Sequence, residues 1–339
     1  MDEMAIFRCS SCGLVQEQPD SLVGTQWRCR RCDSIGPIYN TVAFVERLAT
    51  MYIDAKRELV QLATPPELRD EAGVRSTTAP ALPGELDIFN TDHFASEGQH
   101  GPIVDWFRRR QIRVDLSLRS VDTTGFFDEV AISIGDDYDL LKEVLDRIRW
   151  AQQKEYSSTT IPLAKRPPHD AQAISNFCQR LYDFSFVGKC FHNRSEGNIR
   201  LVIQPAPAIR RFFAGEWLEW AALVNCLKFA KEDGRRISCA RNLTIMLADD
   251  LRHEIDVFVL FDGDQPVCIE CKSGEFRQDI DRCVALRKRL GLSGRRFLVC
   301  VAGLDDDKAV GLSATHDLTF LNERGLPAWL RQELPSRQG

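Results

Sequence analysis

The chain has 339 residues, of which 44% are hydrophobic and 27% charged; this composition excludes a chain disordered throughout and predicts two or three domains. Its 44 basic and 49 acidic side chains give a net charge of −5, which argues against a protein whose whole surface binds nucleic acid but allows a local basic channel. No apolar run approaches the roughly 20 residues of a membrane helix, and the N-terminus lacks a secretory signal pattern, so we expect a cytoplasmic protein that does not associate with a membrane.

Two Cys-x-x-Cys pairs stand near the start of the chain, Cys9 with Cys12 and, after 16 further residues, Cys29 with Cys32. In a chain without a secretion signal, such pairs indicate metal ligands rather than disulfides. Each turn presents two sulfurs to one ion, and the spacing is typical of a tetrahedral four-cysteine zinc site. The pattern predicts a zinc ribbon over residues 1–40, in which a structural Zn²⁺ supplies much of the folding energy.

The residues around these pairs add two expectations. Asp33 follows the second pair as Gly13 follows the first, and both residue types tolerate a positive φ. Arg28, Arg30 and Arg31 can contact phosphates. A module that contacts protein instead is an equally open interpretation of the ribbon.

The next two segments are predicted to be a helix and a linker. Apolar residues spaced three and four apart over 41–63, among them Val45, Leu48 and Tyr52, form a heptad seam on a helix. The seam suits a homodimer contact, which we favour, and also packing on the protein's own body; both stay open. Residues 64–85 are rich in proline and poor in apolar side chains, which predicts a linker.

Residues 86–155 are expected to form a small mixed α/β region. Its predicted elements are a strand at 86–89, a helix over 103–110, strands over 112–118 and 130–134, and a helix over 136–154. Residues 156–204 follow with a helix and a hairpin that has a polar turn, which suits a winged-helix-like module that contacts nucleic acid. An interdomain spacer without such contacts is the open alternative. The helix is predicted over 170–182 and the strands over 184–191 and 198–203.

From residue 205 to the end of the chain, the pattern predicts a mixed sheet with flanking helices. The predicted elements are a helix over 212–231, strands over 237–247, 253–261 and 267–272, a helix over 279–290 and a strand over 296–302. Residues two apart on a strand share a face, so Glu270 and Lys272 point the same way. Asp256 can lie beside Glu270 if the second and third strands form a hairpin.

This arrangement of charged groups has a chemical meaning. Two carboxylates on adjacent strands can hold a divalent cation through oxygen. A lysine beside them can stabilise negative charge that develops on a phosphate. A carboxylate of the preceding helix, Glu219 or one turn earlier Glu216, can complete the site.

The order of these residues resembles the PD-(D/E)XK nuclease superfamily. The matching segments are Trp217-Leu218-Glu219, Glu254-Ile255-Asp256 and, after 13 residues, Ile269-Glu270-Cys271-Lys272. More narrowly, they are similar to the nuclease domain of CRISPR ancillary proteins that join a cyclic-oligonucleotide sensor, the CARF domain, to this fold. The resemblance covers residues 205–303 and implies a restriction-endonuclease-like fold with a mixed central sheet. The sensor of those proteins is longer than residues 86–155, so activation by a cyclic nucleotide is not carried over.

By this resemblance Asp256 and Glu270 are ligands of Mg²⁺ or Mn²⁺, and Lys272 stabilises charge. Glu219, which matches the motif better than Glu216, is a further ligand or base. Polar and basic side chains on or near the following helix are the expected substrate contacts, namely Gln278, Arg287, Lys288 and Arg289.

The expected protein is a multidomain α/β chain that ends in a nuclease domain over 205–339. The expected function is that of a metal-dependent endonuclease that hydrolyses phosphodiester bonds of nucleic acid, DNA ahead of RNA, in defence or nucleic-acid processing. The alternative is a non-catalytic zinc-ribbon regulator that binds nucleic acid on a nuclease-like platform. Residues 205–339 hold 20 basic and 20 acidic side chains, so the acidic excess of the chain lies in the first 204 residues.

Overall fold

The computed structural model describes residues 4–9, 14–23, 25–41, 97–115, 126–193, 195–247 and 252–334. Contacts divide the chain into two compact units, Met1–Ser76 and Thr77–Gly339. Several expected features lie outside the described residues, namely Cys12, the strand at 86–89, the linker over 64–85 and all of the helix over 41–63 except Thr41. Within the described part, no helix combines the length and the apolar character needed to cross a bilayer.

The first unit is a small four-stranded antiparallel sheet in the order β2-β1-β4-β3. Its strands are β1 (Met4–Arg8), β2 (Val15–Pro19), β3 (Gln26–Arg28) and β4 (Ile35–Asn40). Among its described residues, the buried apolar cluster consists of Ala5, Phe7, Cys9, Cys29 and Ile38. Because so little apolar surface is buried, this unit fits the expectation that a metal contributes to its folding.

The second unit is built around a six-stranded mixed sheet in the order β13-β12-β11-β10-β9-β5. The first four of these strands along the chain, which pair antiparallel, are β5 (Arg113–Asp115), β9 (Ile237–Met246), β10 (Arg252–Phe261) and β11 (Gln265–Lys272). Two further strands continue the sheet beyond β11 in parallel, β12 (Phe297–Val301) and β13 (Thr319–Leu321).

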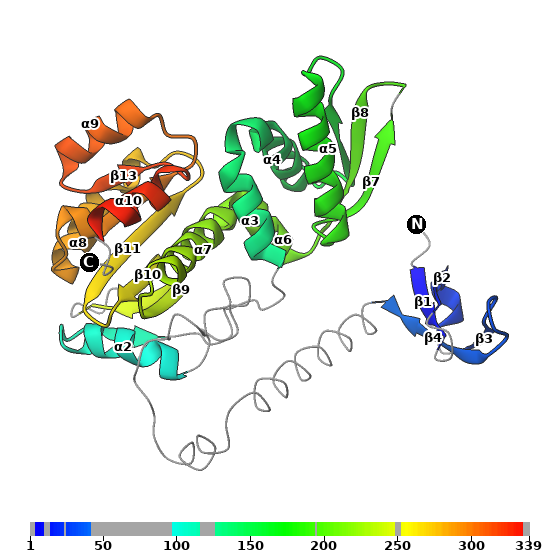
Figure 1. Ribbon diagram of the computed structural model, residues 1–339, viewed down its shortest axis with the longest axis horizontal. Coiled ribbons are helices and arrows are strands. Elements are labelled where there is room, and N and C mark those ends of the chain that lie inside the picture. The colour runs from blue at the N-terminus through cyan, green and yellow to red at the C-terminus, as the bar shows by residue number, and fades with distance from the viewer. Residues whose placement is uncertain are drawn as a thin grey trace, which may run out of the picture. The chain divides into compact units, whose positions relative to one another are not determined.

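Helices cover both faces of this sheet, because alternate side chains of its strands are apolar on both sides. One face packs with α7 (Trp217–Glu232) and α10 (Gly325–Glu333), and Figure 1 shows α7 lying along the sheet. The other face packs with α2 (Glu97–Arg108), α8 (Ile280–Leu290) and α9 (Asp306–His316). The sheet therefore lies between two apolar layers.

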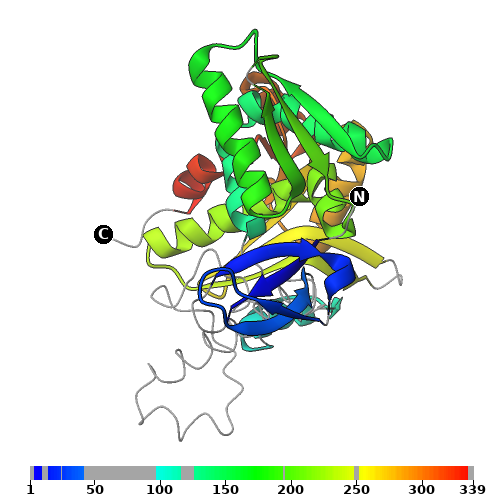
Figure 2. The same cartoon turned by 90° about the vertical axis from the view of Figure 1, so that its right-hand side faces the viewer.

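A second, three-stranded sheet in the order β6-β8-β7 forms the other part of this unit. Its strands are β6 (Ser158–Pro162), β7 (Val187–Asn193) and β8 (Asn198–Ile203), and its helices are α3 (Phe126–Asp136), α4 (Tyr138–Gln153) and α5 (Pro168–Asp183). The helix α5 runs alongside the hairpin of β7 and β8 (Figure 1 and Figure 2). Its buried side chains join the same core cluster as α7, so the two sheets share one apolar core.

Two expectations for the middle of the chain differ from the structure. The strand predicted over 130–134 is wrong, because these residues lie in α3. Phe127, Val130, Ala131 and Ile134 are all buried, which is the helical spacing of three and four rather than alternation. The region expected over 86–155 is also not separate from the nuclease domain expected from residue 205, because β5 pairs with β9 and extends the larger sheet.

Candidate active site

Two of the expected site residues lie together on β11. Glu270 is 1% exposed and lies next to Lys272, whose Nζ is 3.6 Å from Glu270 Oε2. The guanidinium of Arg282, on α8, lies at the same distance of 3.6 Å from this oxygen. A buried carboxylate is thus flanked by two cations that approach from the α8 side of the sheet.

Asp256 lies on β10 at a break in strand alternation. Ile255 and Val257 would share one face of a regular strand, yet Ile255 packs in the core on the α8 side and Val257 in the core on the α7 side. On the neighbouring strand β9, the residue opposite Asp256 in the register is Asn242. Its φ of 54° lies in the left-handed region. Such a backbone conformation is uncommon for a residue other than glycine and concentrates at functional sites.

The carboxylate of Asp256 is fixed by the neighbouring strand. The backbone N–H of Cys271 donates a hydrogen bond of 2.7 Å to Asp256 Oδ2. The ladder between β10 and β11 ends with the pair Val257 and Ile269, so Asp256 and Glu270 are the next residues along the two strands. The two carboxylates therefore lie where β10 and β11 stop pairing.

Glu219 approaches from α7, on the other side of the sheet from Arg282. Its Oε2 accepts a hydrogen bond of 2.9 Å from Nη1 of Arg241 on β9, and the guanidinium of Arg241 in turn lies 4.0 Å from the ring centre of Trp220. With its amide oriented to satisfy its neighbours, Asn242 donates to the same carboxylate oxygen at 2.9 Å. Glu219 is thus held by two polar residues of β9.

A π-helical turn, η5 (Phe212–Glu216), sets the start of α7 against the end of β11. Gly215 has a φ of 156°, and a Cβ at this position would lie 2.6 Å from Ser273 Oγ. The hydroxyl of Ser273 donates to the carbonyl oxygen of Ala214 at 3.1 Å. This contact requires glycine and ties the residue that follows Lys272 to the helix that carries Glu219.

Glu216, the alternative helix carboxylate, points elsewhere. Its Oε1 accepts a hydrogen bond of 2.9 Å from Nε of Arg211. Glu219, by contrast, is held against β9 and interacts electrostatically with Asp256. Of the two glutamates, the structure brings Glu219 to the strand carboxylates.

Burial and mutual repulsion shift the ionisation of this cluster. Burial, with the charge of Asp256 added, raises the pKa of Glu219 from 4.5 to about 8, although Arg241 opposes the shift. Burial also raises the pKa of Asp256, and burial together with the Asp256 charge raises the pKa of Glu270. Burial by itself would lower the pKa of Lys272, but Glu270 and Asp256 outweigh it and raise this pKa. Lys272 is therefore a cation at neutral pH, beside acids that hold their protons unusually well.

The Glu270 carboxylate suits a bound cation. Both of its oxygens are buried and accept no hydrogen bond, and its two cationic neighbours lie at ion-pair rather than hydrogen-bond distance. A carboxylate buried in this way is costly unless it is paired or binds a metal. The next carboxylate along the paired strands, that of Asp256, offers the same hard oxygen ligands, which Mg²⁺ and Mn²⁺ prefer.

Glu219 does not complete a three-carboxylate set. In the described part of the chain, the only group of three or more acidic, cysteine or histidine side chains whose ligand atoms lie within 4.8 Å of one another consists of cysteines. Because Glu219 comes from the α7 side and is held by Arg241, the two strand carboxylates, Asp256 and Glu270, are left as the candidate ligand pair.

The remaining expected substrate contacts lie outside this cluster. Gln278 is exposed on a short 3-10 turn, η6 (Arg277–Asp279). Arg287 is held in place by the carbonyl oxygen of Leu292 and the carboxylate of Asp317, both at 2.8 Å. The last turn of α8 also carries Lys288 and Arg289, which are exposed. Arg287, where this turn begins, is five residues after Arg282, which places it about 7.5 Å further along the helix axis at 1.5 Å per residue.

Three polar residues of the cluster were missed by the sequence analysis, namely Arg241, Asn242 and Arg282. The Arg-Asn pair interrupts an otherwise apolar strand, and this interruption was a usable signal. No comparable signal marks Arg282, because α8 carries several basic residues and only the docking of the helix decides which one meets Glu270.

Three of the four expected zinc ligands gather in the first unit. Cys9, Cys29 and Cys32 bring their sulfurs within 4.8 Å of one another, and the sulfurs of Cys9 and Cys32 are 3.4 Å apart. The turn after Cys29 closes through a 2.8 Å hydrogen bond from its N–H to the carbonyl oxygen of Ser34, and Asp33 has a φ of 58°. This positive φ confirms the expectation for Asp33. Three clustered thiols are soft donors that can hold a metal such as zinc.

Comparisons with known proteins give a limited result. No protein-family model and no curated protein sequence matches the chain. Among solved structures, protein VC1899 from Vibrio cholerae aligns with a TM-score of 0.45 at 16% identity, over 68% of this chain and 60% of that one. Can2 from Sulfobacillus thermosulfidooxidans, solved in complex with cyclic tetra-adenylate, aligns with a TM-score of 0.46 at 14% identity, over 68% of this chain and 59% of that one. The chain thus spans about three fifths of the length of each.

Proposed function

We propose that the second unit is a metal-dependent nuclease that hydrolyses phosphodiester bonds of nucleic acid, DNA ahead of RNA. The observation that carries this proposal is the Glu270 carboxylate, which is buried, accepts no hydrogen bond and adjoins Asp256 and Lys272. A structural role does not require two neighbouring carboxylates with raised pKa values between two apolar layers. Metal-assisted cleavage of a phosphodiester does require oxygen ligands and a fixed cation at one place.

Asp256 and Glu270 would hold Mg²⁺ or Mn²⁺ through their carboxylate oxygens. When bound, the ion supplies a Lewis acid for a phosphate oxygen and a water of lowered pKa. Because binding requires both carboxylates in the deprotonated form, their raised pKa values make the affinity for the ion increase with pH.

Two cations of the chain are available for the phosphate. Lys272 keeps its proton because Glu270 and Asp256 raise its pKa, so it acts as a positive charge that stabilises the negative charge developing in the transition state. The side chain of Arg282 is 54% exposed and its guanidinium lies beside Glu270, where it can contact a second phosphate oxygen.

Glu219 suits the role of general base. Its pKa of about 8 is close to neutral pH, and a general base transfers protons most efficiently when its pKa lies near the pH of the reaction. Arg241 fixes the orientation of its carboxylate. We assign to Glu219 the proton that the attacking water gives up, and to Arg241 the positioning of Glu219.

The test is cleavage of plasmid, single-stranded DNA and RNA by the full-length protein with Mg²⁺ or Mn²⁺. Asp256→Asn and Lys272→Met should each reduce cleavage by about 10²–10³-fold. Matched exposed controls, Asp264→Asn and Lys308→Met, should cleave like the wild type. Equal cleavage by all four variants would overturn the proposal. Binding of DNA without cleavage by the wild type would favour the non-catalytic regulator instead.

A further inference from the structure

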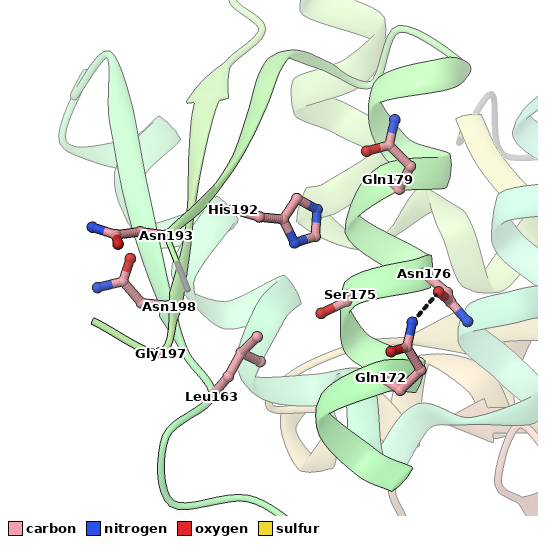
Figure 3. Close-up of a pocket in the computed structure, with 9 residues that line it drawn as sticks. All are labelled: Leu163, Gln172, Ser175, Asn176, Gln179, His192, Asn193, Gly197 and Asn198. Atoms are coloured by element: carbon pink, nitrogen blue, oxygen red, sulfur yellow. Dashed lines mark hydrogen bonds between the residues drawn. The ribbon is translucent and has the colours of Figure 1, made fainter. Parts of the chain in front are cut away.

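A groove of about 490 Å³ separates α5 from the β7–β8 hairpin, away from the carboxylate cluster. On α5, Gln172, Ser175, Asn176 and Gln179 recur at helical spacing and line one wall (Figure 3). From the hairpin, His192 projects across the groove toward α5 (Figure 3). The groove is thus built from the flank of a helix and the inner face of a strand pair.

The hairpin side of the groove contacts the chain that follows β6. Gly197, in the turn, has a φ of 60°, and a Cβ there would lie 2.9 Å from the Cβ of Ala164. The carbonyl oxygen of Gly197 accepts hydrogen bonds from the N–H groups of Leu163 and Ala164 at 2.8 and 3.0 Å. The chain after β6 is therefore fixed to the hairpin end, and the groove keeps its shape.

The chemistry of the lining selects for a neutral, polar ligand. Among the described residues that line it, the side chains are carboxamides, one hydroxyl, one imidazole and one leucine, and none of them is an acid, a lysine or an arginine. At the rim, the carboxylate of Glu196 accepts a hydrogen bond of 2.9 Å from Nδ2 of Asn198, which disfavours an anion inside.

Within the wall, Gln172 Nε2 donates to Asn176 Oδ1 at 2.8 Å, and Gln179 Nε2 donates to Asp183 Oδ1 at 2.9 Å. These bonds leave the amide donors of Asn176 and the carbonyl oxygen of Gln179 for a ligand. A donor and an acceptor of this kind match the edge of a nucleobase, adenine above all.

The opposite face of the hairpin carries basic side chains that can contact the phosphates of a nucleic-acid strand whose base lies in the groove. Arg200 lies between the buried residues Ile199 and Leu201 on β8, so its side chain points away from the core. Its partner in the β7–β8 register is Phe191, which is 51% exposed. Lys189 is exposed on the same strand as Phe191. The strands β6, β7 and β8 contain no aspartate or glutamate, so the charged side chains that these strands place on this face, Lys189 and Arg200, are both positive. Because β7 is an edge strand, a nucleic-acid strand can pass around it.

From these observations we propose that the groove receives an unpaired base of a single-stranded nucleic acid, whose phosphates lie along the basic outer face of the hairpin. Base contacts would give selectivity and phosphate contacts affinity. This site is distinct from the proposed cleavage site and gives the protein a means to capture single-stranded or locally opened nucleic acid.

The experiment compares a fluorescent 12-mer of single-stranded DNA with an abasic 12-mer of the same backbone. Affinity for the full-length protein is measured by anisotropy without divalent cations, so that cleavage does not interfere. Asn176→Ala and Gln179→Ala should each weaken binding of the base-bearing strand by about 3- to 10-fold, the value of one hydrogen bond, and leave the abasic strand unaffected. Gln332→Ala, an exposed amide on α10, is the matched control.

Two outcomes would overturn the proposal. The first is that the groove variants bind the base-bearing strand as tightly as the wild type does. The second is an equal loss of affinity for the base-bearing and the abasic strand, which would mean that the groove contacts only the sugar–phosphate backbone. Unaltered melting temperatures of the variants show that the fold is intact. Because the assay detects binding in the absence of metal, its result is independent of whether Asp256 and Glu270 support cleavage.

Discussion

Nη1 of Arg241 lies 2.9 Å from Oε2 of Glu219, and the two side chains are only 7% and 14% exposed. A buried pair of this kind makes each partner dependent on the other, because removal of one leaves an uncompensated charge. The pair also connects α7 with β9 next to the break in strand alternation at Asn242. The position of the proposed base is therefore set from the strand and not from its own helix.

Arg241→Ala should both destabilise the protein and reduce cleavage. Above pH 8, where Glu219 is ionised, the loss in unfolding free energy should be about 3–5 kcal/mol, measured by denaturant unfolding. Arg241 lowers the pKa of Glu219, so its removal should move the pH–rate profile toward higher pH. Arg241→Lys should restore part of the activity. The double variant Arg241→Ala with Glu219→Gln should be more stable than Arg241→Ala alone, and failure to recover stability would contradict the pairing.

Gly215→Ala should disrupt the contact between η5 and the end of β11. The added Cβ would lie 2.6 Å from Ser273 Oγ and would sit at a φ of 156°, which costs about 1–3 kcal/mol of stability. Cleavage should fall as well, because Ser273 follows Lys272. Gly311→Ala is the control, since a Cβ there meets nothing within 4 Å. Melting temperature and cleavage rate check both expectations, and a Gly215→Ala protein that resembles the control would refute them.

Stability without divalent cations should decline as the pH rises from about 4.5 to about 8. The folded-state pKa of Glu219 is raised from 4.5 to about 8, so the folded state holds a proton that the unfolded state releases within this range. The contribution of the Glu219 carboxyl to the free energy of unfolding is greatest below pH 4.5 and is lost as the pH rises through 8. The melting temperatures of the wild type and Glu219→Gln are measured across pH 5.5–8.5. They should be similar at low pH, and at high pH the variant should have the higher melting temperature. Parallel curves would show that Glu219 titrates normally.

The cysteine cluster of the first unit should bind one zinc ion per chain. Cys29→Ser should abolish this zinc, measured by elemental analysis of the purified protein, because Cys29 is buried among the clustered sulfurs. Cys190→Ala, which removes a half-buried thiol outside the cluster, should retain the metal. Zinc retained in the Cys29→Ser protein would place the ion elsewhere.

Local sequence patterns predicted the elements around the site because their periodicity is strong. The strands that carry Asp256 and Glu270, and the helix that carries Glu219, begin and end within a few residues of the predicted limits, except that the helix starts later, at Trp217, after the π-helical turn. Alternation on β11 also placed Glu270 and Lys272 on one face, as their 3.6 Å contact confirms. These features depend only on neighbouring residues.

Other features depend on residues that are distant in sequence, and the pattern did not contain them. The face switch at Asp256 lies opposite the left-handed backbone of Asn242 on the next strand, and neither feature is marked by the spacing of apolar residues. The contact of Arg282 with Glu270 depends on how α8 docks. The apolar run around Val130 is short enough to suit a strand or a helix, and packing against α7 and its neighbours decided for the helix.

The pairing of β5 with β9 has a practical consequence for protein production. A fragment that begins at residue 205 would lack β5 and α2. Without β5, the backbone N–H and C=O groups of β9 that pair with Arg113–Asp115 would have no partner strand. It would also uncover Phe258, against which Trp106 and Phe107 stack at 5.0 and 4.8 Å between ring centres. An open strand edge beside uncovered aromatic rings favours self-association. Expression of the part of the chain that carries the six-stranded sheet as a monodisperse sample therefore requires a start before Glu97.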